Sequence, residues 1–302
     1  MSDRAMTTRL RALALAAAPA VFVFLWSTGW ISARAAVIDS DPLTFLAARF
    51  GLALVLLLAI VLVIRAPWPK RGTDVVHAIL SGVLLHALYL GGVWWAVGQG
   101  VPAGLSAVLA ATQPIMTAML APVLIREHIS ARQWAGIVLG FGGIMTVLAP
   151  RIAAAHGTDL SQLWFALAVN MGAMLSVTFG SFYQKRFIAA GDLRTTAMLQ
   201  YVGAAPALLV AAYLLEPMHL AISWTSLATM AWSVIAISLG AIMLYLWLIR
   251  NGAVSKSANL IYLVPAASAL EAWVLFGERL NVFQMAGIAI TVAGVALATR
   301  KR

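Results

Sequence analysis

The chain has 302 residues, of which 63% are hydrophobic and 10% charged, with a formal net charge of +10. Soluble domains carry about 25% charged residues, so this composition excludes a water-soluble globular protein. The absence of cysteine excludes disulfide bonds and thiolate metal sites. The basic residues form short clusters between long apolar runs, which indicates a membrane protein rather than a nucleic-acid-binding one.

Ten apolar runs are long enough to span a bilayer, which takes about 20 mostly apolar residues. In chain order they cover 13–38, 42–64, 75–97, 103–125, 132–149, 164–187, 194–215, 222–249, 253–276 and 281–298. The first run follows Arg9 and Arg11 and resembles a signal peptide. It continues through Trp26 and Trp30, so we interpret it as a membrane span.

The distribution of basic residues predicts the orientation. A cytoplasmic N-terminus followed by ten spans places sixteen of the 20 Lys and Arg residues on the cytoplasmic side, three on the other side, and Arg49 within a span. Cytoplasmic segments of membrane proteins carry the excess of Lys and Arg. We therefore expect both termini to be cytoplasmic.

The second half of the chain repeats the first at an offset of 151 residues. The residues that recur include a proline, an acid, an amide and two glycines: Pro114 and Pro265, Glu127 and Glu278, Gln133 and Gln284, Gly136 and Gly287, Gly143 and Gly294. So long a period indicates a duplicated domain, and we predict one repeat over 13–149 and another over 164–298. Each repeat has an odd number of spans, so the two cross the membrane in opposite directions. The predicted fold is an all-α polytopic membrane protein of ten transmembrane helices in two inverted five-helix repeats.

These features carry a resemblance to a known family. The segment PLTFLAARFG around Arg49, and the pattern Gln113-Pro114, Glu127, Gln133-Trp134-Ala135-Gly136 with its second copy, resemble the EamA family of the drug/metabolite transporter superfamily. Within it, the chain looks most like aromatic amino-acid and metabolite exporters of the YddG type. The resemblance covers nearly the whole chain. It implies export of small metabolites across the bacterial inner membrane without ATP hydrolysis, and the sequence contains no Gly-x-x-x-x-Gly-Lys-Ser/Thr loop.

Two charged residues lie deep within predicted spans. Glu271 is the only acidic one, and a charge near the bilayer centre costs at least ~2.5–3.5 kcal/mol, which favours a role in proton coupling. The alternatives are a structural ion pair or a position in an aqueous vestibule. Arg49 lies at a similar depth, where a structural role is favoured and a pairing with Glu271 is conceivable. The residue that matches Arg49 in the second repeat is Gln200.

Two prolines interrupt predicted spans at matching places. Pro114 and Pro265 each remove a backbone donor within a helix. Broken helices near the midplane, at corresponding positions of two repeats, indicate a binding region. Static packing kinks are the alternative.

Uncharged polar and aromatic residues gather at the same depth as the prolines. Their amide, hydroxyl and ring groups suit an amino acid's ends and an aromatic body, although each alone is also explained by helix–helix hydrogen bonds or packing. For His86, proton shuttling competes with a structural role. We predict that the substrate pathway includes Trp26, His86, Tyr89, Gln113, Pro114, Asn170, Tyr245, Asn259, Tyr262 and Pro265. The glycine-rich run 140–143 predicts a packing surface or, as an alternative, a dimer contact.

The leading functional hypothesis is an exporter of neutral small metabolites, foremost aromatic and neutral amino acids, that works by alternating access in the bacterial inner membrane. A proton-coupled exporter of cationic toxic compounds, with Glu271 as the shared site, is the close alternative. An intramembrane enzyme is disfavoured because clustered acid–base or metal-ligand residues are missing from the sequence. A scaffold would leave the deep polar residues unexplained. The expected partners are a small-molecule substrate, the lipid bilayer and protons. We expect no cofactor, no metal and no nucleic acid, and a monomer or weak homodimer.

Overall fold

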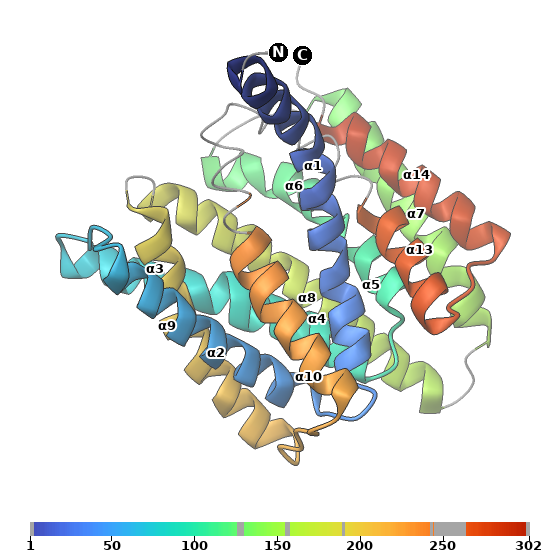
Figure 1. Cartoon of the computed structure of the whole chain (residues 1–302). Coiled ribbons are helices and arrows are strands. Elements are labelled where there is room, and N and C mark those ends of the chain that lie inside the picture. Colours follow the sequence, from blue (N-terminus) through green and yellow to red (C-terminus); the bar gives the residue numbers. More distant parts are fainter. Residues whose placement is uncertain are drawn as a thin grey trace.

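The computed structural model describes residues 3–125, 130–154, 158–188, 191–241, 244 and 264–299. Within these ranges the regular structure is entirely helical (Figure 1). The first half of the chain forms α1 (Asp3–Ala36), α2 (Pro42–Val63), α3 (Gly72–Gly82), the π-helix η1 (Val83–Leu88), α4 (Tyr89–Gly98), α5 (Ala103–Ala110), α6 (Gln113–Ile125) and α7 (Ala131–Ala154).

The second half forms α8 (Thr158–Phe187), α9 (Leu193–Leu215), α10 (Trp224–Ala231), the π-helix η2 (Trp232–Ala241), α13 (Val264–Phe276) and α14 (Val282–Thr299). Every predicted span overlaps one of these helices or a continuous set of them. Parts of the predicted spans 222–249 and 253–276 lie outside the described residues.

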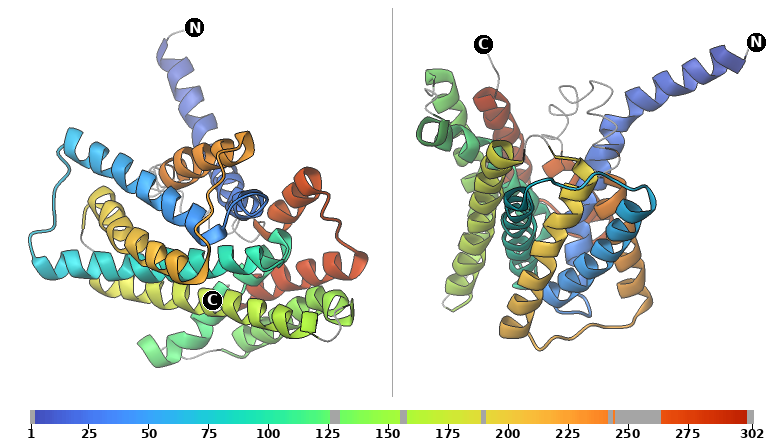
Figure 2. Two further views of the ribbon diagram at one scale, coloured as in Figure 1. Left: turned by 90° about the horizontal axis from the view of Figure 1, so that it is seen from below. Right: turned by 90° about the vertical axis from the view of Figure 1, so that its left-hand side faces the viewer.

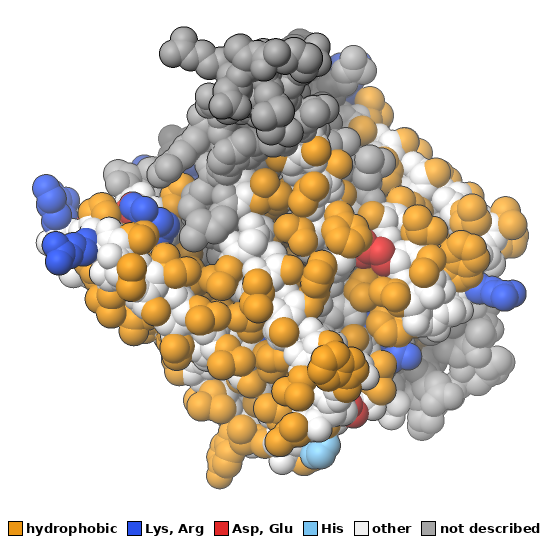
Figure 3. Space-filling model, in the orientation of Figure 1, with side chains coloured by type: hydrophobic (Ala, Val, Ile, Leu, Met, Phe, Trp, Pro, Cys, Tyr) orange, Lys and Arg blue, Asp and Glu red, His pale blue; other side chains and the backbone are white. Residues whose placement is uncertain are grey.

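Five described helical segments are long and apolar enough to cross a membrane: 42–63, 72–98, 161–187, 193–215 and 224–241. Shorter apolar helices cover 20–36, 264–276 and 282–297. On α2, Phe50 and Leu57 are buried, whereas Val55 and Leu62 are exposed. A helix on a water-soluble protein carries a polar outer face, so these apolar outer side chains indicate contact with lipid. Figure 3 shows a mostly hydrophobic face. The predicted all-α polytopic membrane fold is confirmed.

The residues that the repeat conserves have local structural roles. Gln133 forms a reciprocal capping box with Ser130 at the start of α7: Ser130 N–H donates to Gln133 Oε1 at 2.8 Å, and Gln133 N–H donates to Ser130 Oγ at 3.3 Å. Gln284 and Asn281 form the same pair of bonds at the start of α14, at 3.0 and 2.8 Å. Such boxes satisfy backbone N–H groups that a helix leaves free.

The predicted interruption at Pro114 is present. Helix α5 ends at Ala110 and α6 begins at Gln113, so the fourth span is two helices that meet at residues 111–112. Proline suits the first turn of a helix, as Pro114 has in α6, because its missing N–H has no intrahelical acceptor there. In the second half, Pro265 lies on α13, and the residues before Val264 lie outside the described residues.

Helices from the two halves of the chain pack against each other in matching pairs. Helix α2 packs on α9, α5 on α13 and α7 on α14, while α1 packs on η2 and α4 on α8 (Figure 2). Helices α7 and α14 cross closely. A Cβ on Gly143 would collide with Gly287 O and Thr291 N, and a Cβ on Gly294 would collide with Gly140 N and its neighbours. Rising numbers on α7 meet falling numbers on α14, so the two helices run antiparallel. Gly140 and Gly143 of the glycine-rich run thus face α14 of the same chain.

Candidate functional site

Arg49 is the centre of a buried polar and aromatic group. It lies two turns into α2, and only 3% of its surface is exposed. Its Nε and Nη2 both donate to Ser238 Oγ in η2, at 3.2 and 3.1 Å. The rings of Phe50 and Trp94 lie 5.8 and 5.7 Å from its guanidinium carbon, within the range of cation–π contact.

Arg49 and Glu271 do not form the ion pair that the sequence left open as one possibility. Among the described residues no carboxylate lies within ion-pair distance of Arg49; the salt bridges found there join Arg34 to Glu278 and Arg194 to Asp192. Glu271 lies on α13 and contacts Ser27 of α1 instead. The sequence could not decide this because it does not state which helices are neighbours.

His86 lies in η1 and contacts the Phe50 ring, which also lies next to the Arg49 guanidinium. Its imidazole stacks on Tyr201, with centroids 5.1 Å apart, and meets the edge of Phe50 at 6.0 Å. In the Nε2–H tautomer, His86 donates to Gln200 Oε1 at 3.3 Å. The Gln200 amide nitrogen donates to Ser81 Oγ at 3.0 Å and to Gln184 Oε1 at 3.2 Å. His86 is therefore held by hydrogen bonding and stacking.

These residues form a group that we call the central cluster: Arg49, Phe50, His86, Trp94, Gln200, Tyr201 and Ser238. Its members come from α2, η1 and α4 of the first half and from α9 and η2 of the second. The repeat offset relates Arg49 to Gln200 and Phe50 to Tyr201. It also carries η1, residues 83–88, onto 234–239 within η2. π-Helical turns are rare and frequent at functional sites, and here one lies on each side of the cluster.

Glu271 and Ser27 form a second polar contact, between α13 and α1. Ser27 Oγ lies 2.7 Å from Glu271 Oε1 and 2.9 Å from Phe24 O. The Ser27 hydroxyl is the donor in both contacts and has a single proton, so Glu271 Oε1 and Phe24 O share it. Glu271 Oε2, and Ser268 Oγ one turn earlier, are buried without a partner among the described residues.

Asn170 joins α8 to α5. Its side chain is fully buried, and its Nδ2 donates to Ser106 Oγ at 2.7 Å, while its Oδ1 has no partner in the described part of the chain. This bond fits the structural alternative for a deep polar residue, a helix–helix hydrogen bond.

The other predicted pathway residues make none of the contacts described for the central cluster or lie outside the described residues. Tyr89 is buried at the start of α4, Pro265 is buried on α13, and Gln113 and Pro114 are partly buried at the start of α6. Trp26 is 38% exposed and contacts Phe22. Tyr245, Asn259 and Tyr262 lie outside the described residues.

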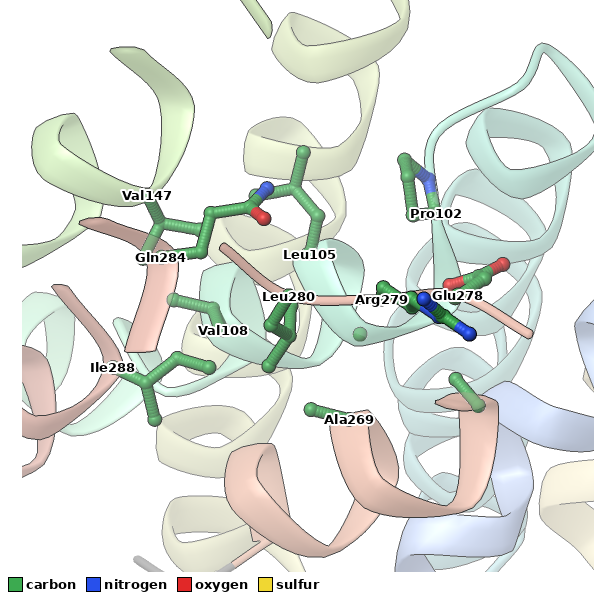
Figure 4. A pocket seen from close by; sticks show the side chains of 12 residues that line it. Pro102, Leu105, Val108, Val147, Ala269, Glu278, Arg279, Leu280, Gln284 and Ile288 are labelled. Carbon is green, nitrogen blue, oxygen red and sulfur yellow. The ribbon is translucent and has the colours of Figure 1, made fainter. Parts of the chain in front are cut away.

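A cavity of about 120 Å³ lies elsewhere, at one end of α5, α13 and α14 (Figure 4). Figure 4 shows Glu278, Arg279 and Gln284 beside apolar side chains such as Leu105 and Ile288. Ligand pockets typically enclose about 300–1,000 Å³, and none of the predicted pathway residues lines this one. Most side chains of the central cluster are buried.

Comparison with known proteins identifies the family. A model of the EamA-like transporter family matches residues 12–149 and, a second time, residues 163–300. The chain belongs to this family. It is 26% identical to the uncharacterized transporter YvbV of Bacillus subtilis over 93% of this chain and 90% of that one. It is 28% identical to the uncharacterized inner membrane transporter YedA of Escherichia coli K12, over 91% and 87%.

A solved structure named only "Crystal structure of protein" has the same fold. The TM-score is 0.62 at 20% identity, over 95% of this chain and 97% of that chain. Together with the apolar helices, the family and the relatives make this chain a multi-pass membrane transporter.

Sequence reasoning did not select several residues of this EamA transporter's central cluster. Phe50 and Tyr201 were not selected because a single ring in an apolar span is usually core. Ser238 stood out only as one polar residue among many. The repeat offset was the available signal, because it maps Arg49-Phe50 onto Gln200-Tyr201.

Proposed function

We propose that this EamA transporter exports small neutral metabolites, foremost aromatic and neutral amino acids, across the bacterial inner membrane by alternating access. One observation carries the proposal: the hydrogen bonds of Arg49 and of His86 join the two halves of the chain. Arg49 of the first half donates to Ser238 of the second, and His86 of the first contacts Gln200 of the second. A site with walls from both halves is remodelled whenever the halves move relative to each other.

The packing of the two halves supports inverted repeats. Gly140 of α7 meets Gly294, and Gly143 meets Thr291, so each residue contacts the repeat counterpart of the other in an antiparallel crossing. Another cross-half pair also matches under the repeat: α1 with η2 corresponds to α8 with η1. Helix α1 begins and α14 ends at the same end of the bundle (Figures 1 and 2). We infer that 13–149 and 164–298 are the two repeats and that both termini face the cytoplasm.

A specific observation favours the second candidate, a proton-coupled exporter of cationic compounds. Glu271 Oε2 is buried without a partner among the described residues, and an unpaired buried charge is costly, so this environment suits a carboxyl that takes up a proton. Against it stands the positive charge of Arg49 at the centre of the molecule, since like charges repel strongly in a low dielectric. Proton coupling by Glu271 is therefore compatible with either substrate.

Transport by the purified protein in liposomes tests the proposal. We expect saturable uptake of labelled phenylalanine and tryptophan, competed by the unlabelled amino acids and absent from protein-free liposomes. Labelled tetraphenylphosphonium serves as the cationic probe. Uptake of this cation but of neither amino acid, by protein shown to be folded, would favour the second candidate.

A further inference from the structure

We propose that Arg49 binds the carboxylate of the transported molecule, and that Ser238 occupies the carboxylate's place when the site is empty. The preferred substrates are then monoanionic or zwitterionic carboxylates with an apolar or aromatic body. This inference rests on the proposed function, because it names the chemical group that the central cluster recognises.

The first step is that, within the described part of the chain, no carboxylate pairs with Arg49. The described carboxylates that form contacts do so elsewhere. Glu216 accepts from the backbone of Leu43 and Thr44, and Glu271 contacts Ser27. The remaining contacts are Asp39 with Ser223, Asp41 with the backbone of His219, Asp192 with Arg194, and Glu278 with Arg34. The sequence of residues 242–263 contains neither Asp nor Glu.

The second step is that a hydroxyl and two rings do not neutralise a guanidinium. Ser238 Oγ accepts from Nε and Nη2 but carries no charge, and the rings of Phe50 and Trp94 offer only their quadrupoles. Buried charges in proteins are normally paired. An anion delivered from solution would complete this site.

The third step is geometric. Nε and Nη2 form one edge of the planar guanidinium fork, and such an edge binds a carboxylate through two parallel hydrogen bonds. In this structure a single oxygen, Ser238 Oγ, bridges both nitrogens at 3.2 and 3.1 Å. Ser238 thus holds the position that a carboxylate would take, and an entering carboxylate must displace it.

The fourth step limits the class of anion. Arg49 is the only Lys or Arg deep within a predicted span, and the imidazole nearest to it is held by Gln200. Phosphoryl groups favour several cationic partners, so one guanidinium suits a single negative charge. Phe50, Trp94 and Tyr201 surround this part of the site with aromatic surface, which suits an apolar body.

Displacement of Ser238 also links binding to conformation. Arg49 lies on α2 and Ser238 on η2, so their bond ties the two halves together in the empty state. A carboxylate that binds Nε and Nη2 of Arg49 breaks these hydrogen bonds to Ser238. Substrate then favours the conformation in which α2 and η2 are apart, by its differential affinity for the two states.

The experiment compares three probes that share one phenyl ring: phenylalanine, 3-phenylpropionate without the amine, and phenethylamine without the carboxylate. Each is tested by competition against labelled phenylalanine uptake and, separately, by thermal stabilisation of the purified protein, which reports binding without transport. We expect both carboxylates to act at concentrations at least about tenfold below phenethylamine, as fits loss of a charge-assisted pair.

Two variants locate the effect. Arg49→Gln places the second repeat's residue at the matching position and should abolish the preference for carboxylates, while Arg49→Lys should keep part of it. Ser238→Ala leaves Arg49 in place and frees the fork, so 3-phenylpropionate should stabilise it more than it stabilises the wild type, with phenethylamine unchanged. The Ser238 variant decides the matter even when Arg49→Gln does not fold.

The outcomes distinguish the role of Arg49 from the proposed function. Phenethylamine competing as well as phenylalanine, with amino-acid transport intact, would overturn the role of Arg49 and leave the proposed function standing. Carboxylate-selective stabilisation that depends on Arg49, without amino-acid uptake, would support this inference and count against the proposed function. Stabilisation of Ser238→Ala by 3-phenylpropionate no greater than that of the wild type would overturn the displacement of Ser238.

Discussion

Phe50 and Tyr201 occupy matching positions of the two halves and touch each other. Their ring centroids are 5.0 Å apart and their planes meet at 79°, an edge-to-face contact of the kind that aromatic pairs favour. The contact therefore joins the first half of the chain to the second. Arg49 and Gln200 precede them in the two sequences, so the central cluster lies where the halves meet.

Removal of the Phe50 ring should destabilise the fold. Phe50 is fully buried and also contacts His86 and the Arg49 guanidinium. Phe50→Ala leaves a cavity, and we expect the free energy of unfolding to fall by about 3 kcal/mol. This is the lower end of the range for a buried Phe, because lipid solvates the groups that the unfolded helices expose. Thermal unfolding in detergent measures it. Leu56→Ala, at an exposed position of the same helix, should change little, and an equal loss in both variants would contradict the packing described.

The crossing of α7 and α14 gives a sharper test, because α7 contains its own control. Gly294→Ala places a methyl group against the backbone of Gly140, whereas a Cβ at Gly142 meets nothing within 4 Å. We expect Gly294→Ala to destabilise by about 1–3 kcal/mol, the usual cost of overpacking, and Gly142→Ala to unfold like the wild type. Circular dichroism melts of the two variants measure this, and similar melting temperatures would show that the helices separate easily.

Much of this architecture could be predicted from the sequence because the repeat marks residues with local roles. Gln133 and Gln284 close capping boxes, and Gly143 and Gly294 allow backbones to meet. Pro114 marks the break between α5 and α6. Each of these roles depends on neighbours in the sequence or on one close helix, so a residue pattern suffices to indicate it.

The partners of the deep residues could not be predicted. Arg49 bonds Ser238, 189 positions away, and Glu271 contacts Ser27, 244 positions away. Those contacts depend on which spans are adjacent. The sequence also could not show which way the Trp26 side chain points. A membrane helix is apolar on both its lipid and its protein side, so hydropathy does not indicate which side chains face the protein interior. The side chain of Trp26 is 38% exposed.

The cap of α9 predicts a dependence on pH. Hydrogen bonds from Arg194 hold the pKa of Asp192 below its ordinary value, and its carboxylate also accepts from the backbone N–H groups of Arg194 and Thr195. A lowered folded-state pKa adds stability above the unfolded value, near 3.9, and this stability is lost as the pH falls through the folded value. Asp192→Ala should therefore lower the free energy of unfolding by about 1 kcal/mol at pH 7. The difference in stability between the variant and the wild type should become smaller below about pH 4. Melts from pH 7 to pH 3 measure it. A constant gap would mean that the charge contributes nothing.

Glu271 offers the most direct test of energy coupling. If the carboxyl carries the coupling proton, an imposed pH gradient accelerates uptake by the wild type. Glu271→Gln should abolish that acceleration while uptake without a gradient persists, because the amide oxygen still accepts from Ser27 but no proton is exchanged. Glu278→Gln is the matched control. It removes a carboxylate that lies just after the end of α13 and pairs with Arg34, and it should keep the response to the gradient. A Glu271→Gln protein that still responds fully would exclude this carboxyl from coupling and leave its contact with Ser27 as a structural tie between α1 and α13.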